Sequence, residues 1–296
     1  MFSPFDLNNA TDYACWRRWK LEHTICDADR LRVEIASPLA LSAAEKNQIV
    51  ELCSTSNMAI YALAGTERDK VLVHALGEQL GLLRLDTNLR ADEDSITSLE
   101  VRAQSGNQYI PYTDKALSWH TDGYYNTPAQ QVRGIIMHCV RPAASGGVNQ
   151  LLDPELLYIR LRDENPAYID ALMHAEAMTI PANIQEGSEL RAAQSGPVFS
   201  LEPGSGCLHL RYSARQRNIE WRDDELTRQA AARTSELLAA GEMVVRHRLE
   251  AGQGIICNNV LHNRSGFADS AEQHRLMYRA RYYDRVADTG LDRMSA

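Results

Sequence analysis

Three residues, the neighbouring His120 and Asp122 and the distant His262, could together bind a metal ion. His120 and Asp122 are two positions apart in the segment 117–123, and because side chains alternate along a strand, both would point to one face. His262 follows a separate apolar run over residues 254–261. Two imidazoles and one carboxylate on one face of an octahedron suit Fe(II) and leave the opposite positions open for an oxidant and a co-substrate. These residues therefore predict an oxidative iron site.

A strand rich in arginine follows the second histidine. Within residues 274–281, Arg275, Arg279 and Arg281 share one parity, so cations would line one face of this strand. If the strand folds back on the strand of His262, a guanidinium group comes near the metal. A planar guanidinium with five donors suits a bidentate grip on a carboxylate. An iron site beside such a clamp predicts a 2-oxo acid as co-substrate.

Three motifs of this sequence resemble those of the taurine dioxygenase family, which includes the clavaminate synthase-like enzymes. They are the Trp-His-Thr-Asp motif at 119–122, the strand at 258–264 that carries His-x-Arg, and the Arg-x-x-x-Arg strand at 275–279. The resemblance runs from about residue 117 to residue 281. It implies an iron(II)- and 2-oxoglutarate-dependent dioxygenase. The implied fold is mainly β with helical insertions, around a double-stranded β-helix (jelly-roll) core.

The resemblance also implies roles for individual residues. His120, Asp122 and His262 would be the iron ligands and hence the catalytic residues. Arg275 would bind the distal carboxylate of 2-oxoglutarate, and Arg279 would face the co-substrate or an anionic group of the substrate. In the family's reaction, O2 converts 2-oxoglutarate to succinate and carbon dioxide while a C–H bond of the substrate is oxidised, usually to a hydroxyl.

The sequence departs from the family pattern at two places. Where the family commonly has Gly-Gly-x-Thr, with the hydroxyl on the far carboxylate of 2-oxoglutarate, this chain has Asn149 after Gly146 and Gly147. An Asn amide can donate a hydrogen bond at that position, so Asn149 is expected to take this role. Where the family's distal strand usually begins with Asp-Asn, this chain has Asn258 and Asn259. That change removes a charge from behind the metal ligands.

Two tyrosines follow the metal motif directly and are expected to border the substrate. Tyr124 and Tyr125 could form an aromatic cage for a quaternary ammonium group, or one could pack while the other caps a pocket. Arg279 and Arg281 could instead favour an anionic substrate, unless Arg281 only pairs with Asp284. The substrate class that these residues favour is a small polar metabolite that is amino-acid-like, betaine-like or another carboxylate.

Two other functions could use the same residues. A zinc hydrolase could bind its metal through the same triad and use a bound water as nucleophile, but Arg275 would then have no purpose. A non-enzymatic sensor could bind 2-oxoglutarate without turning it over, but an intact, open triad argues against it. A requirement for oxygen and a 2-oxo acid would separate the dioxygenase from both.

The composition of the chain agrees with a soluble enzyme. The 296 residues carry a formal net charge of -8, which argues against a nucleic-acid surface because such surfaces usually carry a basic stripe. The six cysteines form no Cys-x-x-Cys pair, and the sequence shows neither a signal-peptide segment nor an apolar run that would span a bilayer. We expect reduced thiols, a cytoplasmic location, a small-molecule substrate and no membrane or nucleic-acid partner, with a homo-oligomer left open.

The elements that must position these residues follow from periodicity and turn residues. We expect a single catalytic domain over residues 1–296, because residues needed for one site span positions 120–279. Residues 1–90 would form an N-terminal decoration of helices and strands, and residues 91–285 the jelly-roll core. Helical insertions into the core are expected near residues 153–175 and 222–240. Helices are predicted over 42–53, 66–81, 153–173 with a break near Pro166, and 223–240, and strands over 59–63, 133–140, 243–249 and 254–261. The segment 211–215 is expected to form a solvated turn or the edge of a pocket.

Overall fold

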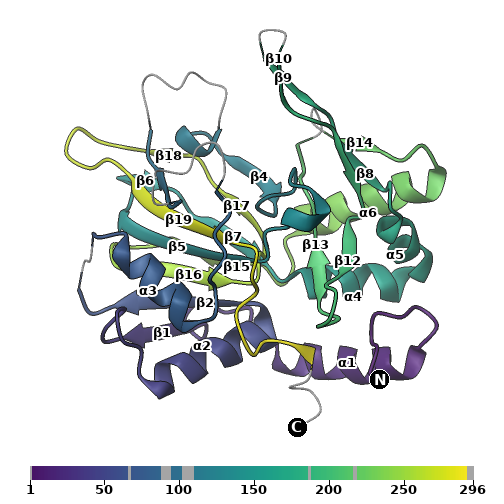
Figure 1. Cartoon of the computed structure of the whole chain (residues 1–296), viewed down its shortest axis with the longest axis horizontal. Coiled ribbons are helices and arrows are strands. Elements are labelled where there is room, and N and C mark those ends of the chain that lie inside the picture. The colour runs from purple at the N-terminus through teal and green to yellow at the C-terminus, as the bar shows by residue number, and fades with distance from the viewer. Residues whose placement is uncertain are drawn as a thin grey trace.

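The computed structural model describes residues 2–65, 68–87, 95–101, 110–185, 188–215 and 219–291 (Figure 1). These residues form helices and mostly antiparallel strands. The two largest sheets have the strand orders β1-β2-β16-β5-β19-β3 and β15-β7-β17-β4. The structure therefore mixes antiparallel sheets with helical segments, as the sequence predicts at this coarse level.

The two large sheets draw their strands from the whole length of the chain. The six-stranded sheet contains β1 (Arg32–Ile35), β2 (Met58–Leu63), β16 (Gln253–Cys257), β5 (Gly134–Arg141), β19 (Leu276–Tyr282) and β3 (Thr97–Leu99). The four-stranded sheet contains β15 (Val245–His247), β7 (Asn149–Leu152), β17 (Leu261–Arg264) and β4 (Leu117–His120). Only β1 and β2 pair in parallel within these two sheets. The N-terminal strands thus extend the largest sheet, although the sequence suggested a decoration beside the core.

Shorter strands form small sheets around the two large ones. They are β6 (Ser145–Gly146), β8 (Met178–Ile180), β9 (Asn183–Gln185), β10 (Ser188–Arg191), β11 (Gln194–Gly196), β12 (Phe199–Leu201), β13 (Leu208–Leu210), β14 (Glu220–Trp221) and β18 (Phe267–Ala268). The β9-β10 hairpin projects from the body of the molecule, at the top of Figure 1.

Capping residues mark the start of α2 (Ala43–Ser56) and the end of α6 (Glu225–Ala240), as the sequence predicts. The helix α2 starts with a capping box, in which the Ser42 hydroxyl accepts from the Glu45 N–H and the Glu45 carboxylate accepts from the Ser42 N–H. The helix α6 ends at Gly241, which takes a φ of 66°. The other helices are α1 (Ala10–His23), α3 (Val71–Gln79), α4 (Pro154–Glu164), α5 (Pro166–Met173) and the 3-10 helices η2 (Ile110–Tyr112) and η3 (Pro128–Gln130).

Most of the predicted helix bounds agree with these. The predicted break near Pro166 separates α4 from α5, because proline lacks the N–H that a continuous helix needs. The helix predicted over 66–81 is shorter and begins only at Val71; residues 66–67 lie outside the described part of the chain.

The two large sheets share one hydrophobic core. Leu151 of β7 and Val245 of β15 belong to the same buried cluster as Ile255 of β16 and Met277 of β19. Leu152, the neighbour of Leu151, belongs instead to a second cluster that includes residues of α4, α5 and α6. Successive strand side chains point to opposite faces, so the four-stranded sheet packs on the six-stranded sheet with one face and among the helical insertions with the other.

The chain crosses from one large sheet to the other just before His262. The single strand predicted over 254–261 is in fact two strands, β16 and β17, which belong to different sheets. Between them, Asn259 takes a left-handed φ of 48°, a conformation that Asn tolerates better than most residues. This turn brings His262 into the four-stranded sheet, where it lies directly opposite His120 of β4.

The arginine-rich strand β19 does not fold back on the strand of His262, and this prediction was wrong. It pairs with β5 and β3 in the six-stranded sheet. Residues 265–275 carry the chain across, with β18 paired to β6 on the way. Arginine side chains of β19 therefore approach the metal ligands from the facing sheet.

Two observations bear on the expectations from composition. Within the described ranges, no helix is both long and apolar enough to cross a lipid bilayer. All six cysteines are free thiols, and four of them are buried: Cys53, Cys139, Cys207 and Cys257. Burial raises the pKa of the Cys53, Cys139 and Cys257 thiols, which suits small core residues rather than nucleophiles.

Candidate metal centre

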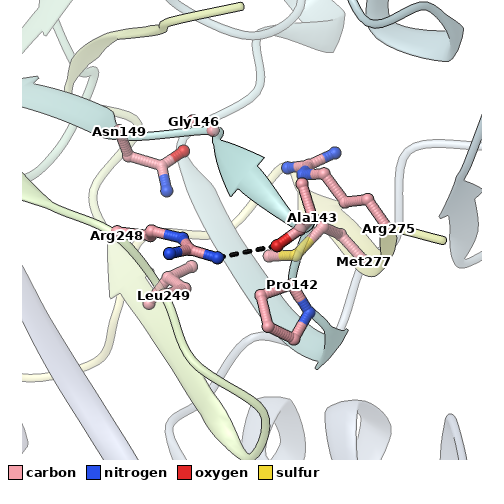
Figure 2. A pocket seen from close by; sticks show the side chains of 9 residues that line it. Pro142, Ala143, Gly146, Asn149, Arg248, Leu249, Arg275 and Met277 are labelled. Atoms are coloured by element: carbon pink, nitrogen blue, oxygen red, sulfur yellow. Dashed lines mark hydrogen bonds between the residues drawn. The ribbon is translucent and has the colours of Figure 1, made fainter. Parts of the chain in front are cut away.

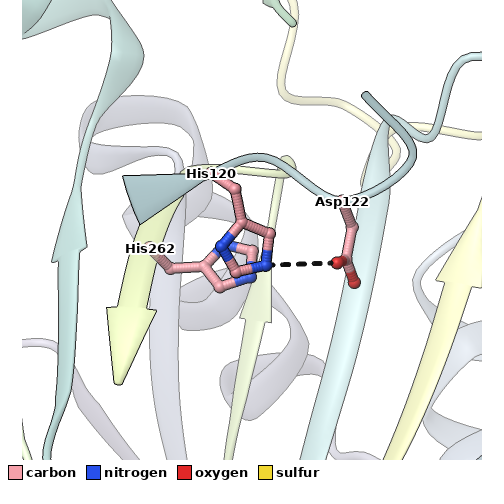
Figure 3. A group of neighbouring side chains, drawn as sticks. All are labelled: His120, Asp122 and His262. Atoms are coloured by element: carbon pink, nitrogen blue, oxygen red, sulfur yellow. Dashed lines mark ion pairs between the residues drawn. The ribbon is translucent and has the colours of Figure 1, made fainter. Parts of the chain in front are cut away.

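The three predicted metal ligands lie together in the folded chain (Figure 3). One ligand atom from each of His120, Asp122 and His262 lies within 4.8 Å of the other two. Nε2 of His120 is 3.7 Å from Oδ1 of Asp122, and the two imidazole centroids are 4.3 Å apart. His120 ends β4 and Asp122 lies in the turn just after it, while His262 comes from β17. Residues separated by about half the chain therefore converge on one point.

Backbone carbonyls orient both imidazoles. Nδ1 of His120 lies 2.8 Å from the carbonyl oxygen of Ser118, and Nδ1 of His262 lies 2.9 Å from that of Val260. With a proton on each Nδ1, these nitrogens donate to the carbonyls and leave each Nε2 lone pair to bind a metal. The sequence did not reveal these partners, because they belong to the backbone two residues before each histidine.

The ionisation of the ligands is also suited to a metal. Burial, helped by the neighbouring His262, lowers the pKa of His120 to about 3, so its imidazole is neutral near pH 7. Burial opposes ionisation of Asp122, but Arg279 and Arg281 outweigh it and hold the pKa of that carboxyl below its usual range. Neutral imidazole and ionised carboxylate are the forms that bind a divalent cation.

The hydrogen bonds of Asp122 leave one oxygen for a metal. Its Oδ1 accepts from Nη1 of Arg279 at 3.2 Å. Its Oδ2 is buried and accepts no hydrogen bond from any described residue. A buried carboxylate oxygen without a partner is costly, and a bound cation would remove that cost. The donor set and this oxygen together fit a 2-His-1-carboxylate iron site.

Asn259 holds the backbone of the metal-binding carboxylate. The Asp122 N–H donates to Oδ1 of Asn259 at 2.8 Å, and Nδ2 of Asn259 donates to the Asp122 carbonyl at 2.9 Å and to the Val132 carbonyl at 2.6 Å. The residue that turns the chain between the sheets thus also fixes Asp122. The sequence marked the Asn258-Asn259 pair only as a departure from a pattern and missed this role.

Residues 211–215 do not form the solvated turn that the sequence suggested, because residues 211–213 are buried. Tyr212 is buried, and its backbone N–H donates to the Thr121 hydroxyl while its carbonyl accepts from the Thr121 N–H. Arg211 is also buried and donates through Nε to the carbonyl of Tyr124. This segment therefore braces both the metal motif and the tyrosine that follows it.

Arg275 and Asn149, the two residues expected to bind the distal carboxylate, line the same small hollow (Figure 2). The other residues around it are Pro142, Ala143, Gly146, Gly147, Arg248, Leu249 and Met277. Arg275 is buried and lies with its guanidinium carbon 5.1 Å from the ring centre of Phe267. No acidic side chain forms an ion pair with its guanidinium in the part of the chain that the structure describes. Burial lowers the pKa of Arg275, which means that an anion in the hollow would be favourable.

Arg264, a neighbouring candidate for the carboxylate clamp, is already occupied. Its Nη2 donates to the backbone carbonyls of Thr113 and Lys115. Its guanidinium carbon lies 4.6 Å from the ring centre of Phe267, the same ring that Arg275 approaches. The geometry therefore favours Arg275 as the residue with donors to spare.

Arg279 and Arg281, the two arginines within β19, have partners near the triad. Arg279 contacts Asp122, so it lies beside the metal ligands rather than in the hollow of Arg275. Arg281 pairs with Asp86 at 2.6 Å and donates to the Tyr125 hydroxyl at 2.8 Å. The alternative pairing of Arg281 with Asp284 is not found, because Asp284 pairs with Arg84.

The two tyrosines follow the metal motif, and Tyr124 lies against one of its histidines. The ring centre of Tyr124 lies 6.5 Å from that of His120, in an edge-to-face arrangement. The ring centre of Tyr125 lies 5.2 Å from that of Tyr124. Both rings are only partly buried, so they remain accessible to a ligand.

Comparison with known proteins agrees with this geometry. The model of the taurine catabolism dioxygenase TauD, TfdA family matches residues 21–281. Two curated relatives are uridine-5'-phosphate dioxygenases: one from a Streptomyces species, 29% identical over 203 residues, which covers 65% of this chain and 71% of that protein, and one from an Amycolatopsis species, 25% identical over 219 residues, which covers 67% and 78%.

A solved structure shows the same fold. The non-heme iron oxygenase OrfP in complex with Fe and alpha-ketoglutaric acid superposes with a TM-score of 0.61 at 14% identity, over 82% of this chain and 80% of that one. The family match spans nearly the whole chain and includes every residue of the metal centre and of the hollow beside it. The members of this family use Fe(II), 2-oxoglutarate and O2. The family match therefore favours the dioxygenase over the zinc hydrolase and the sensor. The chain belongs to the TauD, TfdA family and is an iron(II)- and 2-oxoglutarate-dependent dioxygenase.

Proposed function

We propose that His120, Asp122 and His262 hold the iron, that Arg275 with Asn149 binds the distal carboxylate of 2-oxoglutarate, and that the enzyme oxidises a C–H bond of a small anionic substrate. The observation that carries this proposal is the convergence of the triad, with a buried and unpaired Asp122 oxygen, next to a hollow that holds a guanidinium without an acidic partner. When bound, the iron and 2-oxoglutarate supply the oxidising chemistry. The chain has to orient the groups and keep them dry.

We further propose that the two large sheets form the double-stranded β-helix and that the whole chain works as one catalytic domain. Two observations support this. The sheets share one core, and His120 and His262 come from the four-stranded sheet while Arg279 comes from the facing one, with Arg275 directly before the same strand. A cut between the sheets would therefore divide the site.

The charges around the tyrosines favour an anionic substrate over a quaternary ammonium compound. The guanidinium carbons of Arg191 and Arg281 each lie 5.9 Å from the ring centre of Tyr125. A ring that already faces two cations would bind a third only against their repulsion. Arg279 adds another positive charge beside Asp122, which itself would be neutralised by the metal.

Among anionic substrates, we propose a nucleoside 5'-phosphate, with uridine 5'-phosphate as the first compound to test. The two curated relatives act on uridine 5'-phosphate by their names and share 25–29% of aligned residues with this chain. The cationic surroundings of Tyr125 agree with a phosphorylated compound. Amino acids and carboxylates, the classes that the sequence favoured, are the alternatives in the same assay.

The test is succinate release in air by the enzyme with Fe(II) and 2-oxoglutarate. We expect uridine 5'-phosphate to raise the rate of succinate release well above the rate without substrate, and product analysis to show an oxidised nucleotide or its breakdown product. Asparagine, arginine and a betaine serve as comparison compounds. Stimulation by one of these compounds and none by nucleotides would contradict the nucleotide proposal while leaving the triad in place.

Asn259 offers a prediction about metal binding. In Asn259→Gly the backbone can still adopt the left-handed conformation, but the hydrogen bonds to Asp122 and Val132 are lost. We expect the dissociation constant for Fe(II), measured by anaerobic titration, to rise about 10- to 100-fold, the range seen when partners of metal ligands are removed.

The matched control for this variant is Asn263→Ala. Asn263 lies next to His262, but its amide donates to Gln150 and not to a ligand. We expect its Fe(II) affinity to match that of the wild type. Equal Fe(II) affinities for Asn259→Gly and the wild type would show that Asn259 only shapes the turn.

A further inference from the structure

Arg191 lies near Tyr125, and the proposed function gives it no individual role. It is the last residue of β10 and is partly buried. Its Nη1 donates to the Ala192 carbonyl at 2.9 Å and its Nη2 to the Pro181 carbonyl at 2.6 Å. These contacts hold the guanidinium in place but engage only part of its five donors. In the described ranges no acidic side chain forms an ion pair with it.

The guanidinium of Arg191 is aimed at the tyrosines that follow the metal motif. Its carbon lies 5.9 Å from the ring centre of Tyr125, and the guanidinium of Arg281 approaches the same ring at the same distance. Arg211 is close enough that the charge of Arg191, after burial, helps to lower the pKa of Arg211 to about 10. Three guanidinium groups thus surround Tyr124 and Tyr125.

The counter-charges of this cluster do not balance it. Asp86 pairs with Arg281 and also accepts a hydrogen bond from the Tyr283 hydroxyl. Arg211 donates only to backbone carbonyls, those of Tyr124, Met178, Gly196 and Gln194. Arg191 and Arg211 thus both lack an acidic partner among the described residues, and Arg191, which donates to two carbonyls rather than four, has more donors still available. Burial lowers its pKa, as expected for a guanidinium without an acidic partner.

We propose that Arg191 and Tyr125 form a subsite for the phosphate group of the substrate, and that Arg191 distinguishes a phosphorylated substrate from its unphosphorylated form. This inference rests on the proposed function. A phosphomonoester carries nearly two negative charges at pH 7, and the planar guanidinium grips phosphate oxygens in a bidentate manner. The partly exposed hydroxyl of Tyr125, fixed by Arg281, is a second polar group beside it.

The position of the subsite suits a substrate that extends from the metal. The ring centres of His120 and Tyr124 lie 6.5 Å apart and those of Tyr124 and Tyr125 lie 5.2 Å apart. Arg191 contacts this chain of rings at Tyr125, 5.9 Å from the ring centre, so the phosphate would bind beside Tyr125 while the group to be oxidised lies at the iron ligands. Arg279 contacts Asp122 and so lies at the iron ligands rather than at Tyr125, which excludes it from this subsite.

Calorimetric binding to the full-length enzyme tests the subsite without relying on turnover. The probes are uridine 5'-phosphate, uridine and inorganic phosphate, each titrated into the wild type, Arg191→Ala and Arg191→Lys. For Arg191→Ala we expect the Kd of uridine 5'-phosphate and of inorganic phosphate to rise about 10- to 100-fold, as for the loss of a charged hydrogen-bonded pair. The Kd values of uridine and of 2-oxoglutarate should stay within about twofold, and Arg191→Lys should recover part of the phosphate affinity.

Arg160→Ala is the matched control, because it removes a surface arginine that pairs only with Glu242. We expect it to bind every probe as the wild type does. The inference would be overturned by equal phosphate affinities in Arg191→Ala and the wild type, or by a wild type that binds neither phosphate probe. Loss of inorganic phosphate binding in Arg191→Ala, in an enzyme that does not oxidise uridine 5'-phosphate, would support the subsite and reject only the nucleotide as substrate.

Discussion

Replacing Asp122 by alanine should abolish substrate oxidation coupled to succinate release. Asp122 supplies the only carboxylate of the triad. Its Oδ2 accepts no hydrogen bond from any described residue, so this oxygen is available to a metal. The variant removes the only anionic ligand of the triad and leaves the positive charge of Arg279 facing the cation site, and both changes disfavour a divalent ion. We expect the coupled rate to fall by more than the roughly 100-fold that loss of a ligand's partner can cause.

The measurement is succinate and oxidised product formed per minute in air at saturating 2-oxoglutarate. Asp163→Ala is the control, because Asp163 is a carboxylate that pairs with Arg17 away from the site. Thermal unfolding of each variant separates a loss of metal binding from a loss of folded protein. Full coupled activity in Asp122→Ala would remove this residue from the ligand set.

Replacing Arg275 by alanine should raise the 2-oxoglutarate concentration that the enzyme needs. The guanidinium faces the hollow beside Asn149, and in our proposal it binds the carboxylate that does not react. A charge-assisted contact of this kind is worth about 1.5–3 kcal/mol, or roughly 10- to 100-fold in affinity. Because the contact is the same before and during the reaction, KM for 2-oxoglutarate should rise with a much smaller change in kcat.

Initial rates at varied 2-oxoglutarate check this prediction, and Arg264→Ala is the comparison. The guanidinium of Arg264 bonds the carbonyls of Thr113 and Lys115, so its loss should lower thermal stability and leave KM for 2-oxoglutarate nearly unchanged. If instead KM rose in Arg264→Ala and not in Arg275→Ala, the clamp would have to be assigned to Arg264.

The local parts of the site could be predicted from the sequence because they depend on short-range geometry. The two-residue spacing of His120 and Asp122 indicates two side chains that lie near each other. The capping box of α2 and the break at Pro166 are likewise decided by neighbouring residues. For these features, a few adjacent side chains determine the outcome.

The long-range pairings could not be predicted, because they are decided by contacts between distant segments. An apolar run over residues 254–261 does not show that Asn259 will take a left-handed conformation and divide it between two sheets. The sequence also does not show which strands pair with β19. The same alternation of side chains would be found whether β19 paired with β17 or lay in the facing sheet. Arg211 is a second example. Its charge suggested an exposed position, but it is buried, and its guanidinium donates to backbone carbonyls that are distant in the sequence.

Anaerobic addition of Fe(II) and 2-oxoglutarate to the purified protein tests the central claim most directly. If His120, Asp122 and His262 hold iron beside the hollow of Arg275, a visible charge-transfer band of the chelated 2-oxo acid should appear. The band should need both additions, be absent in Asp122→Ala, and require more 2-oxoglutarate in Arg275→Ala. A wild-type mixture that stays colourless, or a band of equal strength in Asp122→Ala, would contradict the assignment of these three residues as the metal ligands.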